Sequence, residues 1–377
     1  MRLITRLRAL YAAQGALPAG VGTVSGVIAH SLAVLCLLGV IAFHYPEYLT
    51  TPELRQRYSV DVLRGVMLAT LLLSGGIALA NLLLGRMRWL NVCTLVLLVA
   101  ALLLGGPTVP VGDFPDGTAY IGLDWFILDL LGSALGFILL EKWLPMRRDQ
   151  PVFRAEWLTD VVHFAVNHFL IGLALYLINF FVHRLFGGLV YAPLQAAVQA
   201  LPWAIELLLC VLVADLAQYA IHRAYHQLPF LWRFHAIHHS TQTLDWLAGS
   251  RQHFLETVLT RTVVLGALFV FGFSREVMDV YILIVGVQAV LNHSNVKLPW
   301  GPLRQVLVTP EFHHWHHSSE RIALDRNYAV HFSFIDRVFG TAVKSDRALP
   351  EKYGVLGEAM PKGFLRQQLF PFRWRGD

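Results

Sequence analysis

The sequence predicts an all-α, polytopic integral membrane bundle with a histidine-rich metal site on its cytoplasmic side. Of its 377 residues, 56% are hydrophobic and only 15% are charged, which is more apolar than a soluble domain. Long apolar runs recur along the chain, as transmembrane helices require. Eleven of the seventeen histidines lie between residues 222 and 317, where they form regularly spaced boxes.

Six apolar runs of about twenty residues predict membrane spans, because each is long enough to cross a hydrocarbon core of about 30 Å. They lie near residues 23–43, 61–85, 89–107, 119–141, 158–182 and 202–221. Two shorter runs, 258–273 and 277–292, are separated by a few polar residues. These two predict a tight helical hairpin that either spans the membrane or re-enters it.

Basic residues near the span ends predict the orientation, because cytoplasmic loops are enriched in lysine and arginine. Arg2, Arg6 and Arg8 precede the first span, Arg86 and Arg88 follow the second, and Lys142, Arg147, Arg148 and Arg154 follow the fourth. Arg55 and Arg57, in the loop between the first two spans, are the exception. With the N-terminus inside, an even number of crossings places every histidine box on the cytoplasmic side.

The chain is expected to have three parts. Residues 1–150 form a four-span block without evident chemistry, residues 151–342 carry the histidine boxes, and residues 343–377 form a basic tail. The net charge of +5 is distributed around membrane spans, so it indicates contact with anionic lipid and not with nucleic acid.

The histidine boxes predict a site for two metal ions. One box has the spacing H-x-x-x-H and two have the spacing H-x-x-H-H, so each box is expected to direct all of its imidazoles to one side of a helix. Burying so many imidazoles is costly unless a metal coordinates them. A closed structural zinc site needs four ligands, so eight or more histidines favour two ions. Imidazole suits iron, zinc, copper and nickel.

These boxes resemble those of the fatty acid hydroxylase and sterol desaturase superfamily of membrane enzymes with a non-haem di-iron centre. The resemblance covers about residues 155–342 and includes the flanking sequences DLAQYAIHRAYH and VTPEFHHWHH. It implies two iron ions, which zinc can replace on purification, and O2 as co-substrate. It also implies nine metal ligands: His222, His226, His235, His238, His239, His293, His313, His316 and His317.

Further residues are candidates to support these ligands, because a metal-bound histidine usually donates its other N–H to a carboxylate or carbonyl. Asp215 is the preferred carboxylate, since it lies one heptad before His222 within an apolar span. The remaining candidates are His314, His253, Glu256, Asp245 and Asn292. No side chain beyond the metal ligands is expected to act as a conventional acid or base.

The resemblance implies O2-dependent hydroxylation of a C–H bond in a membrane lipid, whether fatty acyl, sterol or polar. A sterol or acyl desaturase of the same family is the main alternative, and an ornithine-lipid or alkylglycerol oxygenase also fits. A metal transporter or a non-redox metal-binding protein is less favoured, because the histidines cluster at span ends. No dinucleotide-binding motif is found, so electrons are expected from a separate ferredoxin- or cytochrome-type donor with its reductase.

Overall fold

The computed structural model describes residues 22–51, 55, 57, 59–114, 120–357 and 359–373. Throughout these residues every named element is helical, and the only β pairings are two isolated single-residue bridges. The all-α prediction is therefore confirmed for the described part of the chain. Arg2, Arg6 and Arg8, which contributed to the predicted orientation, lie outside the described residues.

Seven of the described helices are long and apolar enough to cross a membrane. They are α2 (Thr23–His44), α5 (Val60–Leu83), α6 (Arg88–Leu103), α7 (Leu123–Trp143), α11 (Trp203–Gln227), α13 (Phe254–Phe271) and α14 (Arg275–His293). The last two are joined by a three-residue turn, as expected for a hairpin, but each packs on α11 and not tightly against the other. Gly272 ends α13 with a φ of 67°, a left-handed conformation that glycine adopts without steric cost.

The predicted span at 158–182 is not one straight helix. Its residues divide between α8 (Trp157–Phe169) and α9 (Ile171–Phe186), which form a bent pair at an angle of 59°. Asp160, His163 and Asn167 recur along α8 and bind residues 250–252. This polar stripe explains the bend, because it holds α8 against the loop before α13 while α9 continues as an apolar helix.

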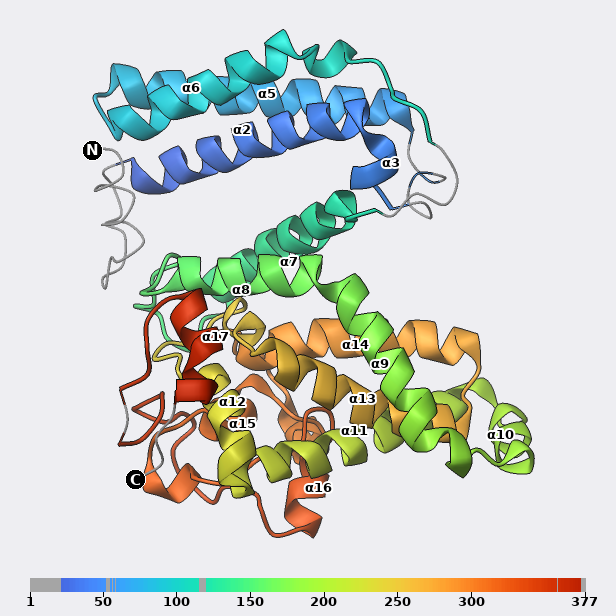
Figure 1. Cartoon of the computed structure of the whole chain (residues 1–377). Coiled ribbons are helices and arrows are strands. Elements are labelled where there is room, and N and C mark those ends of the chain that lie inside the picture. The colour runs from blue at the N-terminus through green and yellow to red at the C-terminus, as the bar shows by residue number, and fades with distance from the viewer. Residues whose placement is uncertain are drawn as a thin grey trace. The chain divides into compact units, whose positions relative to one another are not determined.

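The chain divides into two compact units, and residues 15–132 form the first. Its described elements are α2, α3 (Pro46–Leu49), α5, α6, η1 (Gly106–Thr108) and the start of α7. Helices α2, α5 and α6 pack together (Figure 1) around Cys36, Met67 and Leu98. Buried polar contacts also join them, including Ser74 Oγ to the carbonyl of Ala29 at 2.6 Å.

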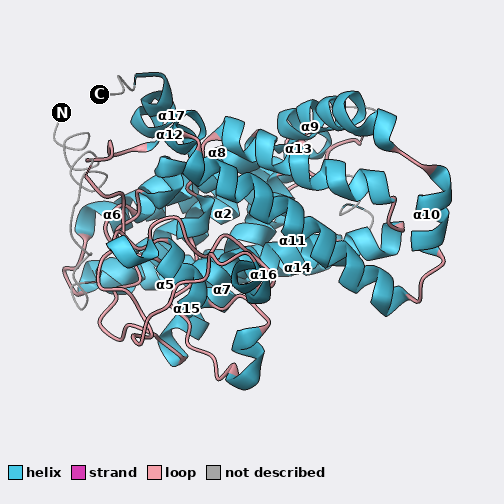
Figure 2. Cartoon of the chain, turned by 90° about the horizontal axis from the view of Figure 1, so that it is seen from below, coloured by secondary structure: helices cyan, strands magenta, loops and turns pink. Residues whose placement is uncertain are grey.

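The second unit continues from Ser133 and contains the histidine boxes. Besides α8, α9, α11, α13 and α14, it comprises η2 (Gly187–Leu189), α10 (Ala192–Gln199), α12 (Pro229–His239), η3 (Ala248–Ser250), η4 (Gly301–Gln305), α15 (Pro310–His316), η5 (Arg321–Ala323), α16 (Ser333–Val338) and α17 (Phe364–Arg373). Helix α11 packs against both α13 and α14 (Figure 2), around Ala214, Leu268 and Val277. Helix α12 packs against α11, and α15 packs against α14, so both short helices lie at the histidine-bearing ends of these spans.

Candidate metal centre

Nine histidines form two groups. Within each group, one ring nitrogen from each residue lies within 4.8 Å of those of the other members. Group A contains His222, His226, His235, His239 and His316. Group B contains His238, His293, His313 and His317. These are the nine residues that the family resemblance implies as ligands, and the fold brings them together from four helices, α11, α12, α14 and α15, and the residue that ends α15.

The two H-x-x-H-H boxes do not each point to one side, as the spacing suggested. In α12, His235 and His239 belong to group A, whereas His238 belongs to group B. In the box at α15 the majority lies in the other group: His313 and His317 belong to group B, and only His316 belongs to group A. Successive helical residues diverge by about 100°, so adjacent histidines in a box diverge enough to serve two centres. Each box therefore connects the two groups.

Local sequence signals place the two short helices. Pro229 begins α12 and Pro310 begins α15, where proline suits the first helical turn. Thr309 caps α15, because its hydroxyl accepts a hydrogen bond from the backbone N–H of Phe312. The chain passes from α11 to α12 through Leu228 alone, which keeps the first two boxes side by side.

Backbone carbonyls fix the protonation of several imidazoles. Nδ1 of His222 donates to the carbonyl of Tyr328 at 2.7 Å, and Nδ1 of His316 donates to that of Arg326 at 2.8 Å. His238 and His293 make the same contact with the carbonyls of Arg251 and Ala289. A carbonyl only accepts, so the proton lies on Nδ1 and the Nε2 atom of each ring carries a free lone pair.

The Nε2 atoms of both groups converge. The Nε2 of His235 lies 3.1 Å from those of His222 and His239, and the Nε2 of His313 lies 3.0 Å from that of His293. Where both rings are protonated on Nδ1, two such lone pairs repel each other unless a cation lies between them. Metal–imidazole bonds are about 2.0–2.1 Å, so adjacent ligands on one ion lie roughly 3 Å apart. The donor set therefore fits a metal ion in each group.

Burial keeps these imidazoles neutral. Burial lowers the pKa of six histidines in the α12 and α15 boxes well below the ordinary value for histidine, and repulsion between neighbouring imidazoles adds to the effect. The six are His235, His238, His239, His313, His316 and His317. Only the neutral form of histidine binds a metal. Burial therefore favours the neutral form that coordination requires at these six histidines.

Glu256, a candidate support, contacts one of the candidate ligands. Its Oε1 accepts a hydrogen bond from Nδ1 of His235 at 2.7 Å, and both side chains are buried. Asp325 contributes a weaker contact of the same kind, with its Oδ1 3.5 Å from Nδ1 of His226. The sequence offered no signal for Asp325, which lies in a loop far from the box that it contacts.

Asp215, the preferred carboxylate candidate, contacts backbone N–H groups and not an imidazole. Its carboxylate accepts hydrogen bonds from the backbone N–H groups of Val330, His331 and Phe332 at 2.6–3.1 Å. Asn292 donates to the carbonyl of Val330 at 3.0 Å. These contacts fix the segment that begins at Tyr328, whose carbonyl orients His222.

His314 and His253 lie outside both groups. His314 has the opposite protonation pattern, because its Nε2 lies 3.1 Å from the carbonyl of Ser294 while its Nδ1 faces the hydroxyl of Tyr353. It thereby anchors the chain beside His293. His253 caps α13 by accepting the N–H of Leu255, and its Nε2 donates to the carbonyl of Gln368 in α17.

Asp245, a candidate for contact with a ligand histidine, is paired with Arg154 at 2.8 Å. Arg154 also binds Asp160, and Asp160 binds the guanidinium of Arg251. All four side chains are buried. The network holds the backbone at Arg251, whose carbonyl accepts the proton of His238. Sequence reasoning missed this network, because its members are scattered from residue 154 to residue 251 without a common spacing.

Comparison with known proteins gives matches over the part of the chain that carries the histidine groups. Residues 207–341 match the family model for fatty acid hydroxylase. The chain is 33% identical over 178 residues to the ornithine lipid hydroxylase OlsE of Rhizobium tropici, covering 46% of this chain and 53% of that protein. It is 26% identical over 155 residues to an alkylglycerol monooxygenase of Caenorhabditis elegans, covering 41% and 30% of the two chains.

A third relative is methylsterol monooxygenase 1 of Rattus norvegicus, 27% identical over 245 residues, which cover 62% of this chain and 78% of that protein. The matches to the first two relatives span about half of their length or less. No solved structure shows significant similarity.

Proposed function

Because residues 207–341 belong to the fatty acid hydroxylase family, we propose that this multi-pass membrane protein hydroxylates a C–H bond of a membrane lipid with O2. Each turnover inserts one oxygen atom of O2 into the C–H bond and reduces the other to water, with two electrons and two protons. The observation that carries the proposal is the pair of buried histidine groups with converging Nε2 lone pairs. Relatives that are named as hydroxylases and monooxygenases of lipids support it.

The nine histidines of groups A and B would hold two iron ions, which supply the activation of O2 that attack on an unactivated C–H bond requires. The protein's own contribution is orientation. Glu256 and the carbonyls of Tyr328, Arg326, Arg251 and Ala289 hold five of the nine rings in the Nδ1–H form, so that the Nε2 atoms of these five rings remain available to a metal. Burial of the rings excludes bulk water from both groups.

We further propose that the centre faces the cytoplasm and receives electrons from a separate ferredoxin- or cytochrome-type donor with its reductase. The basic residues Arg86, Arg88, Lys142 and Arg147 support this orientation. Arg154 does not contribute, because it is buried in ion pairs. The substrate is proposed as a lipid of the fatty acyl, sterol or polar class.

A sterol or acyl desaturase is the second candidate, since the same histidine groups suit removal of two hydrogens from the lipid, which together with two electrons from the donor and two protons reduce O2 to two waters. A metal transporter or a non-redox metal protein is disfavoured, because both groups lie at the ends of α11 and α14, away from the middle of any span.

The proposal is tested on purified protein by elemental analysis and O2 consumption with a chemical reductant. We expect close to two metal ions per chain, predominantly iron, and lipid-dependent O2 uptake. One tightly held zinc ion without O2 uptake would contradict an oxygenase and favour a structural metal site.

A further inference from the structure

Large apolar side chains are exposed on a part of the second unit that contains none of the candidate spans. Leu303 and Val306 lie in η4 and at its end, and Phe334, Val338 and Phe339 lie in α16 and at its end. Their exposed fractions range from 37% for Phe334 to 75% for Val338. Helix α16 packs against η4, so these five residues belong to one surface, here called the η4–α16 surface. Exposed apolar groups of this kind mark a contact site.

Contacts with α11 set the height of this surface relative to the membrane. The ring of Phe339 stacks on Tyr219 at a centroid distance of 4.9 Å, and the N–H of Phe332, one residue before α16, donates to Asp215 at 2.6 Å. Asp215 precedes His222 by seven residues, or about 10 Å of helix, in the direction of the span. The η4–α16 surface therefore lies nearer to the membrane than the metal ligands of α11.

The length of α11 also indicates where Asp215 lies relative to the membrane boundary. Helix α11 begins at Trp203, so only twelve residues precede Asp215. They provide about 18 Å of helix, whereas the hydrocarbon core is about 30 Å thick. If α11 crosses the bilayer, the level of Asp215 lies at or below the membrane boundary, and so does the chain that Asp215 binds.

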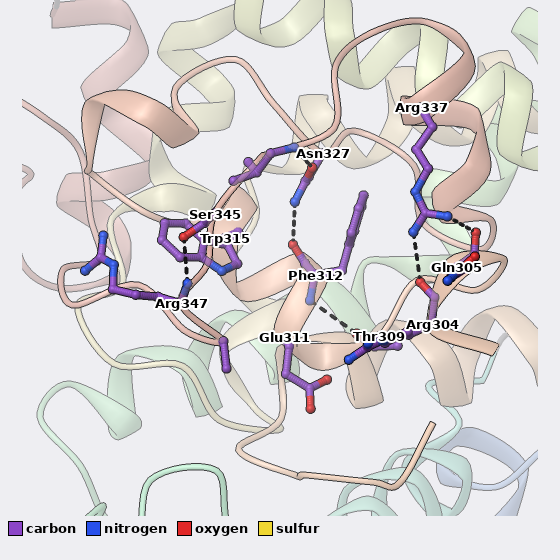
Figure 3. Close-up of a pocket in the computed structure, with 12 residues that line it drawn as sticks. Arg304, Gln305, Thr309, Glu311, Phe312, Trp315, Asn327, Arg337, Ser345 and Arg347 are labelled. Carbon is purple, nitrogen blue, oxygen red and sulfur yellow. Dashed lines mark hydrogen bonds between the residues drawn. The ribbon is translucent and has the colours of Figure 1, made fainter. Parts of the chain in front are cut away.

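Arginines accompany the apolar residues. Arg304 and Arg337 line a pocket of about 530 Å³ beside α15, in which the guanidinium of Arg337 binds the carbonyls of Arg304 and Gln305 (Figure 3). Glu311 is the only acidic residue among the described residues that line this pocket. A third lining arginine, Arg347, is already paired with Glu320 and Glu351.

We propose that the η4–α16 surface is a membrane-interface contact. Its apolar side chains insert among lipid acyl chains, and Arg304 and Arg337 bind the phosphate of an anionic phospholipid. The combination of exposed apolar groups with adjacent arginines suits the boundary between acyl chains and headgroups. This contact holds α15 and its C-terminal cap His317, and with them four of the histidines, at a fixed height above the bilayer. The inference rests on α11 crossing the membrane and is independent of the oxygenase reaction.

A fluorophore at position 338 tests the contact directly. Val338→Cys is made with Cys93→Ala, because Cys36 and Cys210 are buried, and nitrobenzoxadiazole is attached in phosphatidylcholine nanodiscs. We expect quenching by lipids that carry a nitroxide on the acyl chain and protection from aqueous iodide. Ile282→Cys, on α14 and 58% exposed, provides the lipid reference. Glu351→Cys, whose side chain is 75% exposed, provides the water reference.

Iodide quenching at position 338 equal to that at position 351 would overturn the proposal. Protection from both quenchers would also overturn it, because it would indicate contact with protein, such as a second copy or an electron donor. Unchanged metal content of the labelled protein confirms that it is folded.

The arginines are tested in the same labelled protein. Adding phosphatidylglycerol is expected to increase the nitroxide-lipid quenching at position 338, and Arg304→Glu is expected to abolish that increase. Arg321→Glu, in η5, is the matched control and should keep the increase, because Arg321 lines no part of the pocket. The same response in both variants would contradict the phosphate contact.

Discussion

Glu256 accepts a hydrogen bond from Nδ1 of His235 at 2.7 Å, which links the first turn of α13 to the ligand cluster on α12. The carboxylate orients the ring and increases its basicity toward a metal on Nε2. Its second oxygen, Oε2, is buried without a hydrogen-bond partner. The hydrogen bond from His235 is therefore the contact that stabilises this buried carboxylate, and a metal ion on Nε2 of His235 would strengthen that bond.

Replacing Glu256 should weaken metal binding. Glu256→Ala is expected to lower the metal affinity of group A by about 10- to 100-fold, the usual effect of losing such a partner. Glu256→Gln should lower it less, because the amide oxygen can still accept the proton of His235. Competition with a chelator measures both affinities. Glu276→Gln, at an exposed position in the first turn of α14, is the control, and a matching loss there would contradict the role of Glu256.

The division of the H-x-x-H-H boxes can be tested by double substitution. His238→Ala and His239→Ala should each remove one metal, because the two residues belong to different groups. The double variant His238→Ala/His239→Ala should therefore bind almost none. His235→Ala/His239→Ala, with both changes in group A, should retain close to one. Equal metal content in the two double variants, measured by elemental analysis, would show that the groups are not separate centres.

His314 is predicted to orient the chain and not to bind metal. His314→Gln should retain both metals, because a glutamine amide can replace the donor that faces the carbonyls of His293 and Ser294. Loss of one metal from this variant, by the same elemental analysis, would place His314 among the ligands.

Replacing Asp215 is predicted to lower the stability of the fold. Asp215→Asn puts an amide NH2 where a carboxylate oxygen accepts backbone N–H groups, so at least one buried donor loses its partner. The expected cost is about 1–3 kcal/mol, visible as a lower unfolding temperature in detergent. Asp279→Asn, on the exposed side of α14, provides the control. An unfolding temperature equal to that of the control would show that the 330–332 segment is held by other contacts.

His253 is predicted to be structural. His253→Ala removes the cap of α13 and the contact with Gln368, at an expected cost of about 1 kcal/mol. Both metals should remain bound, because no atom of His253 belongs to either group. Thermal unfolding and metal analysis of the same sample separate the two effects. Metal loss at an unchanged unfolding temperature would show that His253 acts on the centre.

The sequence predicts those features in which residues of one type repeat at a helical spacing. The boxes and seven apolar helices could be predicted, because imidazoles and apolar residues leave periodic patterns in the chain. His293 stands alone in the sequence and was implied only by the family resemblance. The opposite division of the two boxes could not be predicted. It depends on how α12 and α15 are rotated toward α11 and α14, which the spacing within a box does not determine.

The partners of the imidazoles were the least predictable part of the centre. Carbonyls of Tyr328, Arg326 and Arg251 carry no side-chain signal, since any residue offers one. Asp245 resembled a support for a histidine because it is an acidic residue near a box, yet a buried arginine, Arg154, competes for it. The bend between α8 and α9 was hidden for a similar reason, because the apolar run masked the polar stripe along α8.

The most direct test of the central claim is mass spectrometry of lipids from cells grown under isotopically labelled O2. Cells that express the intact protein are compared with cells that express His239→Ala, both supplied with an electron-donor system. We predict a lipid species that carries one labelled oxygen atom in the first cells and is absent from the second. Lipids that lose two hydrogens without gaining label would indicate a desaturase, and identical lipids in the two cell lines would contradict a lipid oxygenase.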